Sequence, residues 1–358
     1  MTLRPHAETI YATELAALAA QDQGHRPTGW NLSPRAVVTY LLGDTLADGT
    51  VITPKYFGDR RLIEVAVASL VTDRALLLVG VPGTAKTWVS EHLSAAISGT
   101  SKLLVQGTAG MSEDALRYGW NYARLLAEGP SEKALVPSPI MTGMQEGKLV
   151  RLEELTRIPS DVQDALITVL SEKILPIPEL NREVMAQRGF NVIATANDRD
   201  KGVNELSSAL RRRFNTVTMP LPATLEEEVR IVTDRSRAAA EQMQLPRVKQ
   251  DATAEITKLV TIFRELRSGR TEDGRTQLKT PSATLSTAEA ISVVNQSRAL
   301  SHHFGNSADA DIETEHLAAS LAGAVIKEGG TDETAWREYL DVVVKNRKGW
   351  EGLYDYFS

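Results

Sequence analysis

The chain has 358 residues, enough for two domains that each bury a core. Its apolar fraction of 42% and charged fraction of 24% are ordinary for a globular protein, and its net charge of −6 argues against a general nucleic-acid binder. It has no cysteine, which excludes disulfides and thiolate metal sites, and without a signal-like or membrane-length apolar run we expect a soluble, cytoplasmic protein that makes no membrane contact.

The first 50 residues predict a small helical extension. Residues 8–20 form a helical pattern rich in alanine and leucine, and Ser33 followed by Pro34 predicts the cap and first turn of another helix, which ends at Gly43. We interpret this extension as a packing element, with docking of a partner as the alternative.

An apolar run over residues 75–79 leads through a glycine-rich turn into a helical pattern. Such a run without polar alternation is typical of a parallel strand buried on both faces. The turn directs backbone N–H groups and the positive end of the helix dipole at one anion. The sequence therefore predicts a nucleotide phosphate loop formed by Gly80, Val81, Pro82, Gly83, Thr84, Ala85, Lys86 and Thr87.

Three residues of this loop have specific expected roles. Lys86 would reach the β- and γ-phosphates of ATP, and the Thr87 hydroxyl would ligate Mg²⁺. Ala85 stands where the pattern G-x-x-x-x-G-K-[ST] has its second glycine. We expect Ala85 to enter a right-handed helix, where alanine is more favourable than glycine by about 1 kcal/mol.

The next predicted elements are a strand over residues 102–106 and a helix over residues 113–127. The helix carries Tyr118, Trp120 and Tyr122. These aromatic side chains could grip a substrate in the pore of a ring, but aromatics at helical spacing more often belong to a core.

A further strand, within residues 147–155, ends in two adjacent acids. We expect Glu153 to hold the Mg²⁺ shell through water and Glu154 to act as the general base that polarises the attacking water. Glu153 stands where aspartate is usual, so its additional methylene should lengthen or tilt the metal contact. Arg151 is unexpected inside a central parallel strand, which is normally apolar. The alternative is that two acids merely end an exposed strand.

After a predicted helix at 160–172 and a hairpin at 174–189, a buried strand over residues 190–198 carries Asn197 at its end. An amide at this position can orient the attacking water beside the γ-phosphate. A short helix over residues 205–213 then ends in three arginines. Three arginines are usually a solvated helix end, but in an ATPase ring one of them can reach the γ-phosphate of a neighbouring subunit.

Beyond residue 222 the strand–helix alternation stops and only helical patterns follow, one of them opened by a capping box of Ser286 and Glu289. The predicted fold class is therefore α/β. We expect a helical extension over residues 1–50, a P-loop core with a parallel sheet flanked by helices over 51–222, and an all-α lid with further helices over 223–358.

From about Pro54 to its end the chain resembles an AAA+ ATPase of the MoxR group. In this resemblance residues 80–87 are the Walker A motif, residues 149–154 the Walker B motif and Asn197 sensor 1. The run Glu153-Glu154-Leu155-Thr156-Arg157 is similar to the D-E-I-N-R of the group, with glutamate for aspartate and threonine for asparagine.

The resemblance also assigns residues of the ring interface and the lid. It makes Arg213 the first choice for the arginine finger and Arg212 the second. Ala288 stands where the group usually has the sensor 2 arginine, so that either Lys279 or Arg298 takes this role or the coupling of lid closure to hydrolysis is altered.

What the resemblance implies is a hexameric ring that binds and hydrolyses ATP with Mg²⁺ and remodels a protein client. Proteins of the group commonly act with a partner that bears a von Willebrand factor A domain. Two alternatives belong to other classes: a nucleotide-gated scaffold with little hydrolysis, and a nucleic-acid motor, which the charge disfavours.

Overall fold

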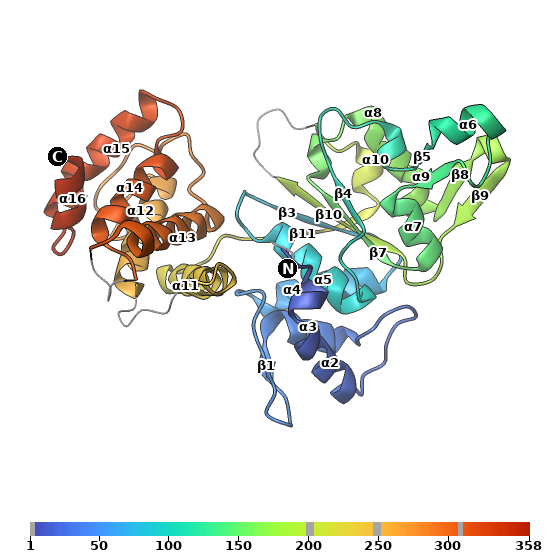
Figure 1. The fold of residues 1–358 in the computed structure, drawn as a ribbon, viewed down its shortest axis with the longest axis horizontal. Coiled ribbons are helices and arrows are strands. Elements are labelled where there is room, and N and C mark those ends of the chain that lie inside the picture. The colour runs from blue at the N-terminus through green and yellow to red at the C-terminus, as the bar shows by residue number, and fades with distance from the viewer. Residues whose placement is uncertain (1–3, 198–203, 246–251, 307–310) are drawn as a thin grey trace. The chain divides into compact units, whose positions relative to one another are not determined.

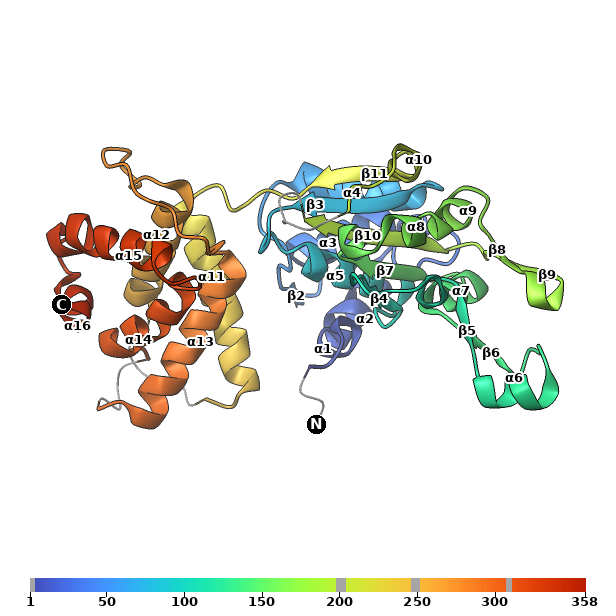
Figure 2. The ribbon, with the colours of Figure 1, turned by 90° about the horizontal axis from the view of Figure 1, so that it is seen from above.

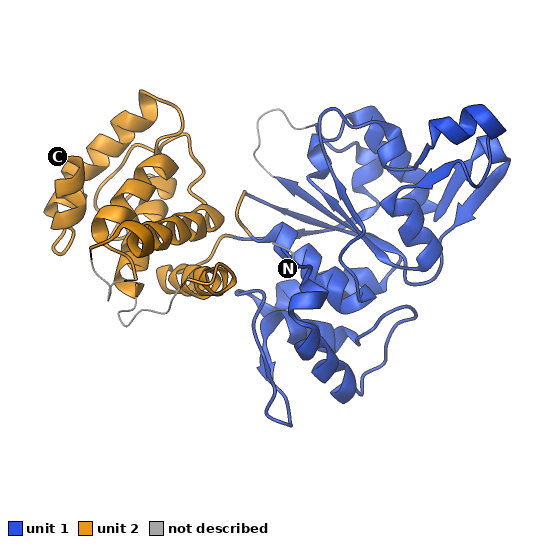
Figure 3. Ribbon diagram, viewed as in Figure 1, with its two compact units in different colours: residues 1–81, 85–220 blue, residues 82–84, 221–358 orange. Residues whose placement is uncertain are grey.

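The computed structural model describes residues 4–197, 204–245, 252–306 and 311–358, and the chain divides into two compact units (Figures 1 and 3). The first unit comprises Met1–Val81 and Ala85–Pro220, and the second comprises Pro82–Thr84 and Leu221–Ser358. In the described part of the chain, no helix is both long and apolar enough to cross a membrane.

The N-terminal extension packs on the α/β part of the first unit. It consists of α1 (Ala7–Ile10), α2 (Ala12–Gln21) and α3 (Pro34–Leu42), followed by the short hairpin β1 (Asp44–Thr45) and β2 (Val51–Ile52) and by α4 (Arg60–Val71). Ser33 caps α3 as expected, because its side chain accepts a hydrogen bond from the N–H of Ala36. Val37 and Leu41 of α3 belong to one buried cluster with Leu78 of the sheet, so packing accounts for the apolar residues of this segment.

The centre of the first unit is a five-stranded, fully parallel sheet with the order β11-β3-β10-β7-β4. Its strands are β3 (Ala75–Gly80), β4 (Leu104–Gln106), β7 (Leu149–Glu153), β10 (Asn191–Asn197) and β11 (Phe214–Thr218). The α/β fold class and the parallel sheet predicted from the apolar runs are confirmed. Because β3, β10 and β7 are adjacent and parallel, their carboxyl ends meet at one edge of the sheet.

Both faces of the sheet are covered, which explains why its strands show no polar alternation. Leu76 and Leu78 face a cluster that includes α3, α4 and α5 (Lys86–Ser98), whereas Ala75 and Leu77 face the opposite cluster. The helices of the opposite cluster include α7 (Pro139–Glu146), α8 (Ser160–Gln163), α9 (Ala165–Ser171) and α10 (Ser208–Arg211).

Two hairpins project from one end of the first unit (Figure 2). One pairs β5 (Tyr118–Trp120) with β6 (Leu135–Pro137) around α6 (Tyr122–Glu128), and the other pairs β8 (Ile174–Ile177) with β9 (Arg182–Met185). Short 3₁₀ turns occur at η1 (Glu113–Ala115), η2 (Leu155–Arg157) and η3 (Pro178–Leu180). The hairpin expected at 174–189 is confirmed.

The single helix expected over residues 113–127 is wrong. A 3₁₀ turn, a strand and a seven-residue helix occupy this stretch instead. The strand forms because Tyr118 pairs across the hairpin with Pro137, a partner that a local helical period cannot reveal. As a result Tyr118 is buried at 6% exposure against the ring of Trp120, whereas Tyr122 is 68% exposed.

In its described residues beyond Leu221, the second unit contains helices and one isolated bridge, between Arg270 and Gln277. Its elements are α11 (Leu225–Gln242), α12 (Thr253–Ser268), α13 (Thr287–Phe304), α14 (Thr314–Val325), α15 (Thr331–Val342), η4 (Val344–Asn346) and α16 (Glu351–Phe357). The capping box of Ser286 and Glu289 at the start of α13 is confirmed. These helices bury one shared apolar cluster and, with it, the carboxylate of Glu265. Arg347 neutralises this carboxylate, and the hydroxyl of Tyr339 donates a hydrogen bond to it.

Candidate nucleotide-binding and active site

The phosphate loop connects β3 to α5, as the sequence predicts. Gly83 has a φ of 82°, a conformation that glycine adopts without a steric penalty. The ammonium group of Lys86 is buried and donates hydrogen bonds to the carbonyl oxygens of Gly80 and Val81, at 2.8 and 2.9 Å. The charge of Lys86 is thereby held inside the loop, where the phosphates of a nucleotide would bind.

The expected conformation of Ala85 is wrong. Its φ of 63° and ψ of 19° are left-handed, so Ala85 precedes the helix and does not enter it. Alanine in this region costs about 1–2 kcal/mol because its Cβ crowds the following carbonyl. The glycine of the usual loop pattern would avoid this cost, so the substitution is tolerated at the expense of backbone strain.

The buried carboxylate of Glu153 is the centre of the site, and it accepts four hydrogen bonds from the protein. Thr87 Oγ1 and Thr195 Oγ1 donate to Oε2, at 2.8 and 2.7 Å. Ser90 Oγ and Arg151 Nη2 donate to Oε1, the latter at 3.0 Å. Because a carboxylate has about four acceptor positions, the protein itself fills the capacity of Glu153.

These residues fit the Mg²⁺ ion that a phosphate loop implies. Thr87 gives its hydroxyl hydrogen to Glu153, so the lone pairs of its oxygen remain for a cation, and hydroxyl and carboxylate oxygens are ligands that Mg²⁺ takes. Thr87 would bind the ion directly, and Glu153 would act on it through the Thr87 hydroxyl that it orients. When bound, the ion would neutralise charge on the nucleotide phosphates.

Glu154 follows directly after β7, and its backbone is also left-handed, with a φ of 54°. Its N–H donates to Thr195 Oγ1 at 3.0 Å, which fixes the start of the turn. Its carboxylate is partly exposed and accepts a hydrogen bond from Arg157 Nη1 at 3.0 Å. Strained backbone of this kind is concentrated at functional sites, so the left-handed Glu154 next to the buried Glu153 is a candidate functional group.

Asn197 is the last residue of β10 and lies in register with Gly80, the first residue of the phosphate loop. The strand order therefore brings Asn197, Glu153 and the loop to the same edge of the sheet. This edge, outside the carboxyl ends of parallel strands, is where open α/β sheets bind their ligands.

The arginines after α10 differ in their surroundings. Arg213 Nε donates to Ser171 Oγ at 2.7 Å, and Arg213 Nη1 donates to the carbonyl oxygen of Ala209. The Arg212 side chain is exposed and has no hydrogen-bond or ion-pair partner among the described residues.

Two contributors to the site were not recognised in the sequence. Thr195 contacts both Glu153 and Glu154, and Ser90 contacts Glu153. Both positions carry a weak signal: Thr195 lies two residues before Asn197, on the same face of its strand, and Ser90 lies about one helical turn after Thr87. Serine and threonine are too common in proteins for this spacing alone to assign them.

The residues considered for the sensor 2 position lie in the second unit, and each is described there by its own contacts. Ala288 is exposed in the first turn of α13. Lys279 forms an ion pair with Glu338 at 2.6 Å, and Arg298 forms one with Asp311 at 2.9 Å. Both candidate bases therefore have partners within their own unit.

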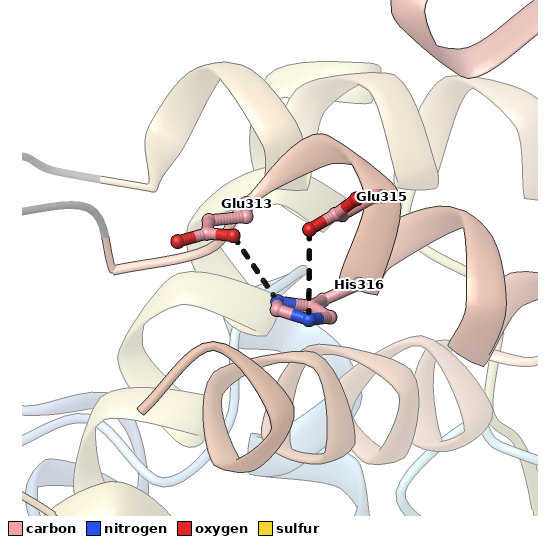
Figure 4. Close-up of side chains that lie close together, drawn as sticks. All are labelled: Glu313, Glu315 and His316. Carbon is pink, nitrogen blue, oxygen red and sulfur yellow. Dashed lines mark ion pairs between the residues drawn. The ribbon is translucent and has the colours of Figure 1, made fainter. Parts of the chain in front are cut away.

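A second cluster of metal-ligand side chains, Glu313, Glu315 and His316, lies at the start of α14 (Figure 4). Glu313 approaches Nδ1 of His316 at 3.6 Å, whereas Glu315 approaches Nε2 at 3.9 Å. The two carboxylates therefore flank opposite nitrogens of one ring. That is the geometry of ion pairing, and a chelated cation would require both carboxylates beside the same nitrogen.

Comparison with known proteins identifies the class. Residues 75–214 match the AAA domain family, dynein-related subfamily, and residues 226–356 match the C-terminal domain of YehL-like AAA+ ATPases. Two crystal structures of NtrX from Brucella abortus, one in complex with ADP, share the fold with a TM-score of 0.50 at 14% identity. They cover 84% and 80% of this chain, which spans 62% of each of those chains. The chain is an AAA+ ATPase by fold and by family.

Within this class, the chain is 40% identical over 359 residues to the uncharacterized protein YehL of Escherichia coli, covering 98% of this chain and 96% of that protein. It therefore belongs to the YehL-like AAA+ ATPases. Shorter matches at 27% and 28% identity reach the uncharacterized proteins SH1500 of Staphylococcus haemolyticus and SAUSA300_1302 of Staphylococcus aureus. These matches span 59% and 54% of those two proteins.

Proposed function

We propose that the chain is a Mg²⁺-dependent, ATP-hydrolysing AAA+ ATPase of the MoxR type, and that it works as a ring-forming, chaperone-like remodeller of a protein partner. The observation that carries the proposal is the junction of Lys86, Thr87 and Glu153. At one edge of the sheet lie three groups: a buried ammonium that can bind phosphates, a hydroxyl that can bind a cation, and a carboxylate that orients this hydroxyl.

In the proposed reaction, Glu154 takes a proton from the attacking water, and Asn197 orients that water. Glu154 is suited to this role because it is partly exposed beside the buried Glu153, so water can reach it. Its hydrogen bond to Arg157 holds the carboxylate while no substrate is present.

Ring formation would complete the site with an arginine from a neighbouring subunit. The exposure of Arg212 supports it as the finger, because a residue that acts on a neighbour must be accessible on the surface of the protomer. Arg213 is the alternative, but it is held by Ser171 and Ala209 of its own chain. A hexamer is the assembly that the resemblance to the MoxR group suggests.

Contact with a protein client is supported by the surface of α6. Tyr122 and Leu126 lie four residues apart on this helix, on one face, and are 68% and 89% exposed. Apolar side chains presented side by side on a projecting hairpin suit contact with another protein. A partner that bears a von Willebrand factor A domain is the candidate that the resemblance suggests.

The test is steady-state ATP hydrolysis with Mg²⁺ or EDTA, and with DNA, RNA or the candidate partner added. We expect Mg²⁺-dependent turnover that a protein partner changes and nucleic acid does not. Glu154→Gln should keep ATP binding and lose about 10²–10⁴-fold in turnover, the usual contribution of a positioned base. Lys86→Ala should abolish ATP binding. A wild-type protein that binds ATP and assembles without turnover would instead be the gated scaffold, and stimulation by DNA or RNA would indicate a nucleic-acid motor.

A further inference from the structure

Arg151 lies in the middle of β7, between β10 and β4, and it is only 4% exposed. A charged side chain in the centre of a parallel sheet is costly unless charges and hydrogen bonds compensate it. The guanidinium of Arg151 therefore requires compensating partners. These partners lie on the face of the sheet that α5 covers, because Leu149 of the same strand belongs to the cluster on that face and residues two apart share a face.

The contacts of Arg151 connect three segments of the chain. Nη2 donates to Glu153 Oε1 at 3.0 Å and to the carbonyl oxygen of Thr87 at 3.3 Å. Nε donates to Ser90 Oγ at 3.1 Å, and Nη1 donates to the carbonyl oxygen of Ser101 at 3.3 Å. Neutralising Glu153 would require only the first of these bonds. The other three tie the guanidinium to α5 and to the segment that follows it.

Ser101 is itself fixed from the side of the N-terminal extension. Its hydroxyl and its N–H donate to the carboxylate of Glu8, at 2.8 and 3.2 Å. Glu8, in α1, therefore holds the residue whose carbonyl oxygen holds Arg151. The anchor of the guanidinium is thus part of the folded framework of the first unit.

We infer that Arg151 is a positioning residue, which fixes the carboxylate of Glu153 and, through it, the hydroxyl of Thr87 that faces Mg²⁺. Arg151 occupies Oε1, so that Oε2 remains for Thr87. A glutamate has one more rotatable bond than the usual aspartate, and the bond from Arg151 restricts this freedom together with those from the three hydroxyl groups. The two departures from the usual motif, glutamate at 153 and arginine at 151, then form one functional unit.

The inference deepens the proposed function and rests on it, but its test measures binding. A fluorescent, non-hydrolysable ATP analogue is titrated with Mg²⁺ against wild type, Arg151→Met, Glu153→Gln and the double variant. Loss of a residue that orients a metal ligand typically costs about 10–100-fold in metal affinity. We expect Arg151→Met to raise the Mg²⁺ concentration for half-maximal binding by about tenfold. The double variant should need no more Mg²⁺ than Glu153→Gln alone, because Arg151 acts through Glu153.

The matched control is Arg347→Met in the second unit. Arg347 also binds a buried carboxylate, that of Glu265, with bonds of 2.8 and 3.1 Å. This control should lower the melting temperature and leave the Mg²⁺ curve unchanged. If Arg151→Met behaves like the control, or if its effect multiplies with that of Glu153→Gln, Arg151 only compensates a buried charge and the inference is overturned.

Arg151→Lys keeps the test decisive should Arg151→Met fail to fold. Lysine retains the positive charge but lacks the planar fork that serves several acceptors at once. We expect its Mg²⁺ curve to shift in the same direction as that of Arg151→Met, and a curve identical to wild type would overturn the inference. Wild type that binds Mg²⁺ and nucleotide without turnover would refute the proposed hydrolysis alone, whereas unshifted variants of an active wild type would refute the positioning role alone.

Discussion

Arg213 Nε donates a hydrogen bond to the hydroxyl oxygen of Ser171, 2.7 Å away, and this ties the arginine after α10 to the end of α9 in the same chain. The adjacent Arg212 has no such partner among the described residues and is exposed. The two neighbouring arginines therefore stand in different situations: one is held within the protomer and the other is available to a second molecule.

The first prediction separates these arginines. Arg212→Ala should bind ATP normally and lose about 10³–10⁵-fold in turnover, the usual effect of removing an arginine finger. Arg213→Ala should mainly lower the melting temperature, because it breaks contacts within the protomer. Turnover is measured on each variant and on mixtures with wild type. Small fractions of Arg212→Ala should depress the activity of whole rings, and a loss only in proportion to the mutant fraction would refute a finger that acts on a neighbour.

The second prediction concerns the strain at Ala85. Glycine is at ease in the left-handed region that Ala85 adopts, so Ala85→Gly should raise the free energy of unfolding by about 1 kcal/mol. The matched control is Ala68→Gly, at an exposed position inside α4 of the same unit, where the same change should lower stability by a similar amount. Thermal melts of both variants check the signs. A lower melting temperature for Ala85→Gly would contradict the left-handed conformation.

The third prediction concerns the length of the side chain at position 153. Glu153 meets four donors, and Glu153→Asp would withdraw the carboxylate by roughly 1.5 Å, one carbon–carbon bond. We therefore expect weaker Mg²⁺-dependent nucleotide binding, by about tenfold, together with slower hydrolysis. A Mg²⁺ titration and a turnover assay measure the two effects. Activity equal to or above that of wild type would mean that the shorter acid serves the metal as well.

The fourth prediction concerns the pH dependence of the second unit. Burial by itself would raise the pKa of Asp332, but hydrogen bonds from the N–H groups of Ser282, Glu328 and Lys327 and from the Ser282 hydroxyl outweigh it and lower the pKa to about 2. An unfolded aspartate has a pKa of about 3.9. The contribution of Asp332 to stability is therefore fully present above about pH 4 and is lost as the pH falls towards 2.

Melting temperatures of wild type and Asp332→Asn between pH 2 and 7 test this expectation. Wild type should melt higher at neutral pH, and the gap should close as the solution is acidified below about pH 4. The exposed Asp355 supplies a control, since Asp355→Asn should melt like wild type throughout. A gap that does not depend on pH would show that the charge of Asp332 is not what stabilises this unit.

Much of the site framework could be predicted from local patterns. The apolar runs that became β3 and β10, the glycine-rich loop between β3 and α5, and the pair of acids at the end of β7 lie where they were expected. The caps at Ser33 and Ser286 were also foreseen. Each of these features depends on residues that are close in sequence, so that composition and spacing carry the information.

The errors arose where a distant partner or a backbone dihedral decided the outcome. Residues 118–120 became a strand because they pair with 135–137 across a hairpin, and the local pattern alone favoured a helix. Ala85 became left-handed because the phosphate loop must turn there before α5 begins. Only at Ala85 does the structure adopt a conformation that the residue disfavours, whereas Tyr118 and Trp120 are of types that suit a strand once a partner strand is present.

The sequence by itself determined the class of this protein: a buried strand, a phosphate loop and paired acids identify a nucleotide-binding α/β protein. Only the tertiary structure decided how Glu153 is held. Its donors come from α5, β7 and β10, and Ser90 is separated from it by 63 residues. Which donors bind a carboxylate depends on distances and angles in space, and these depend on how the helix and strands pack. The order of residues along the chain does not specify either of them.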